Sequence, residues 1–284
     1  MIVPSRSNAA ILSLRSSLPT PYDLKINPGD ILGWPNLRIQ YATDPGKLAA
    51  LLPPGLEPSD TANVHLNIYC IPVPDEPEFG VVIDVDADYR GQKGKYCLGY
   101  GIDQESAIYI SKDMNGQPKF PCEIDYFRLG DSVRARCTHQ GYTFLEYTGK
   151  STGAAELPAE EHDFQWWIKV SRAVGGAEKA YDIEPHVVSV ESRSQPVHRE
   201  TVVGELRLLE SPWDPIAERL PMAGEATAYL NTAKPIQRAI TRAGKLDPDG
   251  FWPFVDTIGS SRWPGTMGGP MREIDWSTYP DEYR

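Results

Sequence analysis

Short runs in which apolar and polar residues alternate dominate the pattern along the chain. Residues 36–42 place Leu37, Ile39 and Tyr41 on one face, with polar residues between them. A period of two is typical of a β-strand with one buried face. The other strand-like runs cover residues 64–71, 133–138, 142–147, 164–170, 187–192 and 202–209.

Helical signals are few. Residues 44–52 predict a helix with Thr43 or Asp44 as its N-cap and Pro45 in the first turn. A second helix is predicted over residues 235–243, whereas the apolar residues 107–110 predict a strand. Many short strands, 24 glycines and 26 prolines favour an antiparallel sheet that closes into a barrel or folds as a sandwich.

The chain has no internal repeat and no change of composition that marks a linker before Lys245. We therefore expect a single domain over residues 1–245. Residues 246–284 are rich in Trp, Pro and Gly, and we expect an extended arm that packs on its own subunit or on a neighbour. A disordered tail is the less favoured alternative, because Trp252, Trp263 and Trp276 would be costly to leave in water.

Charge and cysteine content narrow the function classes. With 28 Lys and Arg against 39 Asp and Glu, the net charge of −11 argues against nucleic acid or an anionic membrane as the partner. The chain begins with a segment too weakly apolar for a good signal peptide, and it has no run long enough to span a membrane. Its four cysteines lack zinc-ligand spacing, so we expect no zinc site and reduced core thiols in a cytoplasmic protein.

Two common motif types can be set aside. Gly99-Tyr100-Gly101 has no third glycine and no following helix, which excludes a nucleotide-binding loop. The five histidines are scattered, and no two have metal-ligand spacing.

Lys119 is the residue with the clearest chemical potential. It lies between Pro118, Phe120 and Pro121 in a stretch that begins at Asn115. Prolines restrict the backbone, and phenylalanine excludes water. Poor solvation of the ammonium lowers a lysine pKa, and a neutral amine can attack a ketone to form a Schiff base. The bland alternative is a solvated lysine in a turn.

A resemblance to a known family rests on four stretches that occur in order. They are residues 37–53, Glu78 followed by residues 83–85, the loop Gly116-Gln117-Pro118-Lys119, and residues 204–208 with 214–216 and 220–221. Together they resemble the early strand and helix, an acidic strand, the "G-x-P-K" lysine loop and the last long strand of the acetoacetate decarboxylase-like superfamily. The resemblance covers roughly residues 18–245.

The resemblance implies an α+β, mostly β fold, with an antiparallel cone-shaped barrel and a few flanking helices. It implies that Lys119 is the nucleophile, that Glu78 is the acid/base group facing it and that Tyr229 faces the cavity. Ordinary roles as a loop carboxylate and a core tyrosine are the alternatives for Glu78 and Tyr229. The family also implies a small keto acid as substrate, no cofactor and a homo-oligomer.

Departures from the family pattern bear on the reaction. Ala42 stands where the decarboxylases have a carboxylate-binding arginine, and Phe120 replaces a second lysine. Asn67 replaces a second cavity glutamate, and Gln117 replaces an aromatic residue. Arg38 and Gln40 share alternation parity with Ala42, so they are the candidate substitutes for the missing arginine.

These departures resemble the divergent branch of the superfamily, whose members catalyse aldol condensation with dehydration or hydration. The favoured interpretation is therefore a Schiff-base lyase with Lys119 and Glu78 as catalytic residues. Gln117, Asn67, Tyr229, Phe120, Arg38 and Gln40 are the substrate-binding candidates. The chemistry would be one of these two or decarboxylation of a keto acid other than acetoacetate. The competing class is a non-catalytic barrel that binds a small apolar or aromatic ligand.

Overall fold

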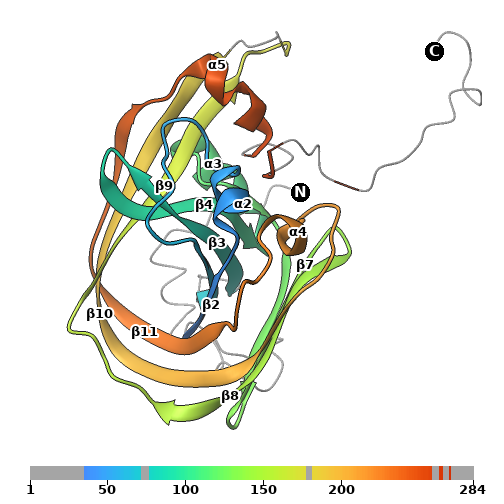
Figure 1. Ribbon diagram of the computed structural model, residues 1–284, viewed down its shortest axis with the longest axis vertical. Coiled ribbons are helices and arrows are strands. Elements are labelled where there is room, and N and C mark those ends of the chain that lie inside the picture. The colour runs from blue at the N-terminus through green and yellow to red at the C-terminus, as the bar shows by residue number, and fades with distance from the viewer. Residues whose placement is uncertain (1–34, 72–76, 177–180, 258–261, 265–268, 270–284) are drawn as a thin grey trace, which may run out of the picture. The chain divides into compact units, whose positions relative to one another are not determined.

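A computed structural model describes residues 35–71, 77–176, 181–257, 262–264 and 269 (Figure 1). Contacts group the chain into two units, residues 1–30 and 31–284, and all described residues belong to the second. The prediction of a domain over residues 1–245 therefore falls partly outside the described residues, as do Trp276 and most of the predicted arm.

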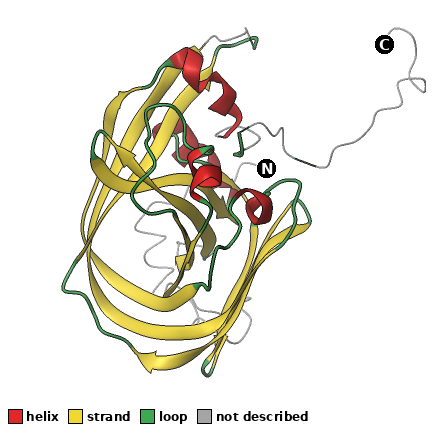
Figure 2. Cartoon of the chain, viewed as in Figure 1, coloured by secondary structure: helices red, strands yellow, loops and turns green. Residues whose placement is uncertain are grey.

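Strands dominate the described part of the chain, and the helices are short (Figure 2). The strands are β1 (Asn36–Ala42), β2 (Asn63–Ile71), β3 (Glu78–Tyr89), β4 (Gln92–Ile102), β5 (Lys119–Pro121), β6 (Glu123–Leu129), β7 (Ser132–His139), β8 (Tyr142–Ala154), β9 (Glu161–Arg172), β10 (Tyr181–Leu208) and β11 (Thr227–Lys245). The helical elements are α2 (Pro45–Ala49), α3 (Glu105–Asn115), α4 (Ile216–Arg219), α5 (Pro248–Phe251) and the 3-10 turn η2 (Trp252–Thr257). The expected α+β, mostly β class is confirmed.

All eleven strands belong to one sheet. Along its main path the order is β11-β1-β2-β3-β4-β9-β10, after which the C-terminal part of β10 continues to β8, β7 and β6. Strand β11 also pairs with β10, so the pairings of seven strands return to their starting point. Most pairs are antiparallel, but β4 pairs in parallel with both β5 and β9.

The predicted alternation of β1 and β2 is confirmed. Leu37, Ile39 and Tyr41 are buried in the main core together with Val64, Leu66 and Ile68. Helix α2 begins after Asp44, whose side chain accepts a hydrogen bond from the Lys47 backbone N–H, as expected for an N-cap. The two runs predicted at 187–192 and 202–209 join in the single long strand β10, which has three register shifts against β11.

Two predicted elements are wrong. Residues 235–243 form part of strand β11, where they pair with β10 from Ser194 to Val188. Residues 107–110 lie within helix α3. In both cases the local pattern is ambiguous, because a short apolar run fits a helix or a strand. Contacts with distant parts of the chain, such as the pairing of β11 with β10, decide which element forms.

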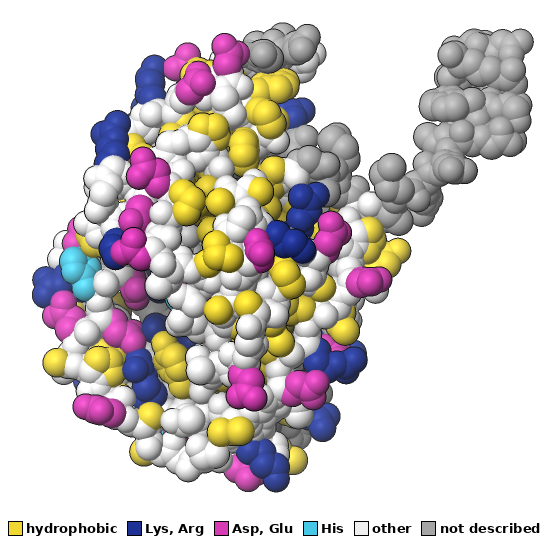
Figure 3. Space-filling model, viewed as in Figure 1, with side chains coloured by type: hydrophobic (Ala, Val, Ile, Leu, Met, Phe, Trp, Pro, Cys, Tyr) yellow, Lys and Arg dark blue, Asp and Glu magenta, His cyan; other side chains and the backbone are white. Residues whose placement is uncertain are grey.

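Other features of the chain follow the sequence. The four cysteines are buried, and none of them forms a disulfide within the described residues. The described residues contain no helix that is long and apolar enough to cross a membrane. On the face shown in Figure 3, acidic and basic side chains are interspersed. Trp263, at the predicted arm, is 1% exposed, which agrees with the expectation that this tryptophan is buried.

Candidate functional site

The loop that carries Lys119 joins helix α3 to strand β5. Gly116 ends α3 with a φ of 69°, and a Cβ there would lie 2.5 Å from the Ile168 carbonyl oxygen on β9. Only glycine combines this backbone conformation with so close an approach. The Tyr100 N–H donates to the Pro118 carbonyl oxygen at 3.0 Å, and the register then sets Lys119 opposite Tyr100 on β4. The "G-x-P-K" loop is therefore fixed at both ends.

The Lys119 side chain is buried at 9% exposure. Its Nζ lies 5.4 Å from the centroid of the Tyr100 ring. Desolvation by burial lowers the pKa of Lys119, the Glu78 carboxylate opposes that effect, and the positive charge of Arg238 adds to it. Burial and Arg238 disfavour the ammonium form of Lys119, and Glu78 favours it. The net result is a pKa below the ordinary value of a lysine.

Glu78 is the first residue of β3 and is 8% exposed. The Tyr69 hydroxyl on β2 donates to Glu78 Oε1 at 2.8 Å. Tyr69 also packs edge-on against Tyr100, with ring centroids 5.9 Å apart. The two tyrosines thus connect Glu78 to the ring that lies beside Lys119, and they hold the carboxylate in one position.

Phe120 points away from Lys119, as successive residues of a strand do. Its ring packs where β4 carries no side chain: a Cβ at Gly99 would lie 3.2 Å from Phe120 Cε1, and one at Gly101 would lie 2.9 Å from Phe120 Cζ. The Gly99-Tyr100-Gly101 segment is therefore shaped for this packing, with Tyr100 on the lysine side between two glycines that accept Phe120.

A closed charged cluster lies behind Phe120. The Arg262 guanidinium stacks 3.2 Å from the Phe120 ring centroid and forms an ion pair with Asp214, which is fully buried. His139 Nδ1 lies 2.7 Å from Asp214 Oδ2. Burial and the nearby Arg262 lower the pKa of His139 to about 4, so the ring is neutral at pH 7 and Nδ1–H donates to the carboxylate. Trp263 Nε1 donates to the same carboxylate at 3.5 Å.

A cavity of about 260 Å³ lies beside the lysine site. Side chains from β1, β2, β3, β4, β9, β10 and β11 line it, which are the seven strands whose pairings close on themselves. Its lining includes Tyr100 and Arg238, the two residues that also face Lys119. Lys119 and Glu78 are not among the lining residues, and the lining residue Tyr100 has its ring centroid 5.4 Å from Lys119 Nζ.

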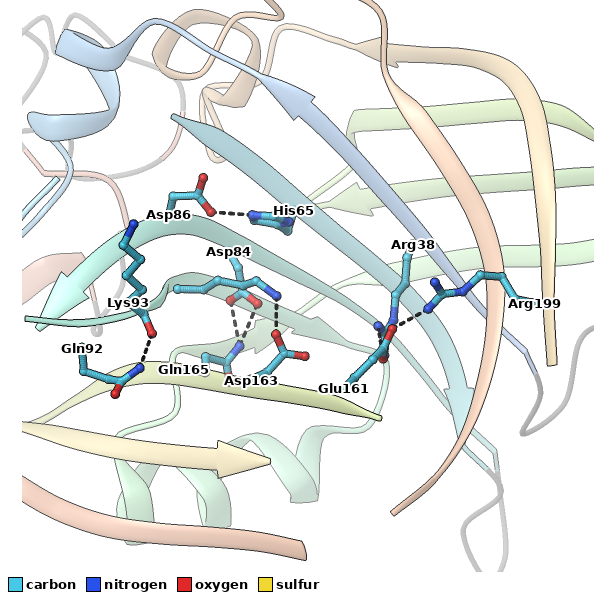
Figure 4. Close-up of polar contacts among 11 residues, drawn as sticks. Arg38, His65, Asp84, Asp86, Gln92, Lys93, Glu161, Asp163, Gln165 and Arg199 are labelled. Carbon is cyan, nitrogen blue, oxygen red and sulfur yellow. Dashed lines mark hydrogen bonds and ion pairs between the residues drawn. The ribbon is translucent and has the colours of Figure 1, made fainter. Parts of the chain in front are cut away.

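The cavity wall is strongly polar (Figure 4). Arg38 NH1 donates to Glu161 Oε2 at 2.8 Å, and Arg199 pairs with the other oxygen of the same carboxylate. Lys95 Nζ pairs with Asp163 Oδ1 at 3.0 Å, within the same part of the cavity.

A half-buried carboxylate, that of Asp84, lies next to this pair. Gln165 Nε2 donates to both oxygens of Asp84, at 2.7 and 2.9 Å. Burial raises the pKa of Asp84, although the positive charge of Lys95 opposes the rise. His65 Nε2 lies 2.6 Å from Asp86 Oδ1. In this part of the cavity, Lys95 and His65 therefore already have carboxylate partners.

The substrate-binding candidates fall into two groups. Asn67, Tyr229, Arg38 and Gln40 line the cavity, and Asn67 Oδ1 has no hydrogen-bond partner among the described residues. Gln117 and Phe120 are buried outside the lining, Gln117 in the loop and Phe120 against the Arg262 cluster. The structure thus brings Lys119 and Glu78 together outside the lining, next to Tyr100, and places four of the other candidates within the lining.

Sequence reasoning missed Tyr69, Tyr100, Asp84, Lys95 and Arg238. Tyr69 shares alternation parity with Asn67, so the pattern of β2 could have suggested it. No local signal marks Arg238, because it lies in the segment that was predicted to be a helix. Within the described residues, no group of three or more His, Cys, Asp or Glu could hold a metal ion.

Comparison with solved structures shows the same fold in several relatives. An acetoacetate decarboxylase matches with a TM-score of 0.64 and 16% identity over 80% of this chain and 95% of that one. The acetoacetate decarboxylase of Legionella pneumophila matches with a TM-score of 0.60 and 16% identity, covering 86% of this chain and 98% of its own. The enduracididine biosynthesis enzyme MppR, in complex with pyruvate, matches with a TM-score of 0.56 and 16% identity over 78% and 94%.

A search of curated proteins found no significant match. The sequence profile of acetoacetate decarboxylase, however, matches residues 17–236, which is well over half of the chain and includes the lysine loop. The predicted resemblance is confirmed by this match, and the chain belongs to the acetoacetate decarboxylase family.

Proposed function

We propose that the protein is a cofactor-independent lyase that forms a Schiff base between Lys119 and a small keto acid. The observation that carries the proposal is the buried Lys119 amine, whose pKa is lowered by desolvation and by Arg238, beside the fixed carboxylate of Glu78. A lysine that is neutral near physiological pH is a competent nucleophile toward a ketone.

The proposed chemistry begins with attack of the neutral Nζ on the substrate carbonyl carbon. A C–N bond forms, the carbonyl oxygen leaves as water after two proton transfers, and a protonated imine remains. The imine accepts an electron pair from the adjacent carbon when that carbon loses a proton or carbon dioxide. Glu78 moves the proton, since its carboxylate is positioned by Tyr69 and interacts with Lys119. Asn67 and Tyr229 on the cavity wall, and Gln117 in the loop, orient the substrate.

Aldol condensation with dehydration, or hydration, fits this site better than decarboxylation of acetoacetate. The decarboxylases' carboxylate-binding arginine is replaced by Ala42, and their second lysine is replaced by Phe120, which packs against Arg262 instead. The fold neighbour MppR was solved with the condensation product of pyruvate and imidazole 4-carboxaldehyde. We therefore expect slow or absent release of carbon dioxide from acetoacetate, and we keep a larger 3-keto acid as a possible decarboxylation substrate.

Borohydride trapping tests the proposal. Wild-type protein is incubated with pyruvate and sodium borohydride, and the adduct is located by mass spectrometry after digestion. We expect one adduct on Lys119. Lys95 and Lys112 are the internal controls: the carboxylates of Asp163 and Asp84 raise the pKa of Lys95, and burial lowers the pKa of Lys112 as it does that of Lys119. An adduct on either control with Lys119 unmodified would refute the assignment.

A non-catalytic binding protein is the second candidate, and the separation of Lys119 from the cavity lining favours it. The lining, however, is too rich in charged groups for the apolar or aromatic ligand expected for that alternative. Such a ligand would remove water from the charged side chains without offering them hydrogen bonds in return, which costs free energy of binding. A protein that binds pyruvate but gives no trapped adduct at any pH would support this candidate over the lyase.

A further inference from the structure

One cation of the cavity wall lacks a carboxylate partner. The cationic or ionisable basic side chains of the lining are Arg38, His65, Lys95 and Arg238. The first three are paired with Glu161, Asp86 and Asp163, respectively. Arg238 forms no ion pair with any described carboxylate, and its nearest described ring contact is Trp167, whose centroid lies 6.0 Å from the guanidinium carbon. Its charge is therefore available to a ligand.

The charges within the cavity differ from one part to another. Lys95 interacts electrostatically with Asp84 and Asp163, where its positive charge is already neutralised. Arg238 interacts instead with Tyr100 and Lys119. An anion would be repelled by the two aspartates and attracted by Arg238, so the electrostatics place a ligand carboxylate on the side that faces Lys119.

The local structure supports this orientation of Arg238. Its Cα partner across the ladder is Ser192 on β10, which also lines the cavity, and Val190 lies two residues away on the same wall. Arg238 is exposed at the β10–β11 pair and borders the cavity from that side, whereas Ala42, which stands at the position of the decarboxylases' arginine, does not line the cavity. It also lies beyond residues 17–236, the part of the chain matched by the family profile.

We propose that Arg238 binds the carboxylate of the keto acid and thereby presents the carbonyl carbon to Lys119. This inference rests on the proposed function. It assigns carboxylate binding to Arg238 instead of Arg38, whose guanidinium already pairs with Glu161. A guanidinium binds a carboxylate through two parallel hydrogen bonds, which orients the ligand as well as attracting it. Arg238 would then be a specificity-determining residue for substrates that carry a carboxylate next to a ketone.

Paired ligands with and without a carboxylate provide the test. Pyruvate and acetone both present a ketone to Lys119, but only pyruvate has the carboxylate. Borohydride trapping is measured against ligand concentration for wild type, Arg238→Met and Arg238→Lys, at a pH where the trapping rate of each variant has reached its plateau. We expect Arg238→Met to raise the half-saturating pyruvate concentration about 10- to 100-fold and to leave that of acetone unchanged.

The matched control is Arg242→Met. Arg242 lies four residues along β11, is exposed and does not line the cavity. It should leave the half-saturating concentrations of both ligands unchanged. Arg238→Lys should fall between wild type and Arg238→Met for pyruvate, since it keeps the charge but loses the fork of parallel donors.

A second measurement separates failure of this inference from failure of the proposed function. Propionate and propionamide cannot form an imine, and their binding is measured by calorimetry in a Lys119→Met background with and without Arg238→Met. Loss of propionate binding alone supports Arg238 as the carboxylate receptor even if no adduct is ever trapped. Equal pyruvate half-saturation in wild type and Arg238→Met, or unchanged propionate binding, overturns the inference while leaving imine formation on Lys119 to stand.

Discussion

Two charged clusters lie on opposite faces of the short strand β5, and they are built in opposite ways. On one face, Lys119 lies near Tyr100 and interacts electrostatically with Glu78 and Arg238, and Arg238 forms no ion pair with any described carboxylate. On the other face, Arg262 and His139 both bind Asp214, so every charge has a partner. One cluster borders a cavity of about 260 Å³, whereas in the other the Arg262–Asp214 pair is buried behind Phe120 and only His139 lines a hollow, of about 410 Å³.

The difference shows how the position of Lys119, the proposed nucleophile, can be fixed. A buried ion pair adds little net stability over an apolar replacement, but it fixes the position of what packs on it. The buried Arg262–Asp214 pair packs against Phe120, which is the residue next to Lys119 in β5. This packing restricts movement of the backbone that carries the amine. In the cluster around Lys119, by contrast, the charge of Arg238 stays unpaired, and a bound anion would pair with it.

The largest expected effect comes from removing the amine on the open face. Lys119→Met should abolish borohydride-dependent labelling by pyruvate, because no other group has the same position beside Glu78. The variant should also be at least as stable as wild type at pH 7. A depressed folded-state pKa means that the folded protein binds the proton less tightly than the unfolded chain, so Lys119 costs stability below its folded pKa and that cost disappears as pH rises toward its unfolded value.

Labelling by mass spectrometry and urea unfolding at pH 7 and pH 10 measure these two effects. Residual labelling at the wild-type rate would mean that another lysine forms the imine. A large loss of stability in Lys119→Met would mean that the amine is a structural group like Arg262 and that the two faces of β5 are alike.

Breaking the buried Arg262–Asp214 pair should have the next largest effect. Asp214→Ala leaves the Arg262 guanidinium buried without its carboxylate, which should lower the free energy of unfolding by about 3–5 kcal/mol. The matched control on the open side is Asp163→Ala, whose side chain is 47% exposed and whose pair with Lys95 should contribute about 0–1 kcal/mol. Urea unfolding followed by circular dichroism gives both values.

A double replacement sharpens this result. Asp214→Leu combined with Arg262→Met removes both charges and should recover most of the stability lost in Asp214→Ala. Equal destabilisation by Asp214→Ala and Asp163→Ala would contradict the distinction between a buried and an open cluster.

Filling the space above Phe120 should have a smaller effect. Gly101→Ala places a Cβ 2.8 Å from Cys122 Cβ and 2.9 Å from Phe120 Cζ, so the strand or the ring must move. Such overpacking should cost about 1–3 kcal/mol and should reduce the rate of imine trapping by displacing β5. Gly91→Ala serves as the control for packing, because nothing lies within 4 Å of a Cβ there, although its φ of 78° adds backbone strain. An unchanged rate of imine trapping in Gly101→Ala would contradict the prediction that packing on the Phe120 face of β5 affects Lys119 on the other face.

The smallest predicted effect is a shift in pH dependence. Glu78 raises the pKa of Lys119 through its negative charge, so Glu78→Gln should lower that pKa further. Trapping needs the neutral amine and increases as pH rises through the pKa. The midpoint of the trapping profile should therefore move to lower pH, while overall turnover falls if Glu78 is the proposed acid/base group. A midpoint that moves upward would show that Glu78 does not act on Lys119 electrostatically.

Much of the wall of the site was predictable from the sequence alone. The alternation of residues 36–42 and 64–71 predicted β1 and β2 and the burial of Leu37, Ile39 and Tyr41, since a period of two arises from backbone geometry. The order of the family motifs indicated Lys119 and Glu78 as a pair. An N-cap at Thr43 or Asp44 and reduced cysteines also followed from local chemistry and composition, and the structure has Asp44 as the N-cap and no disulfide among these cysteines. A cytoplasmic location and a homo-oligomer stay predictions.

Only the tertiary structure decided what the polar face of each strand meets. Arg38, Gln40 and Asn67 read in the sequence as an alternating polar set, and the pairing of β11 with both β1 and β10 makes them line a cavity. Arg238 and Arg262 reach the two faces of β5 from about 120 and 140 residues away along the chain. A local pattern cannot encode such contacts, because their energy depends on which distant strands pair, and long-range pairing overrode the helical pattern of the segment that contains Arg238.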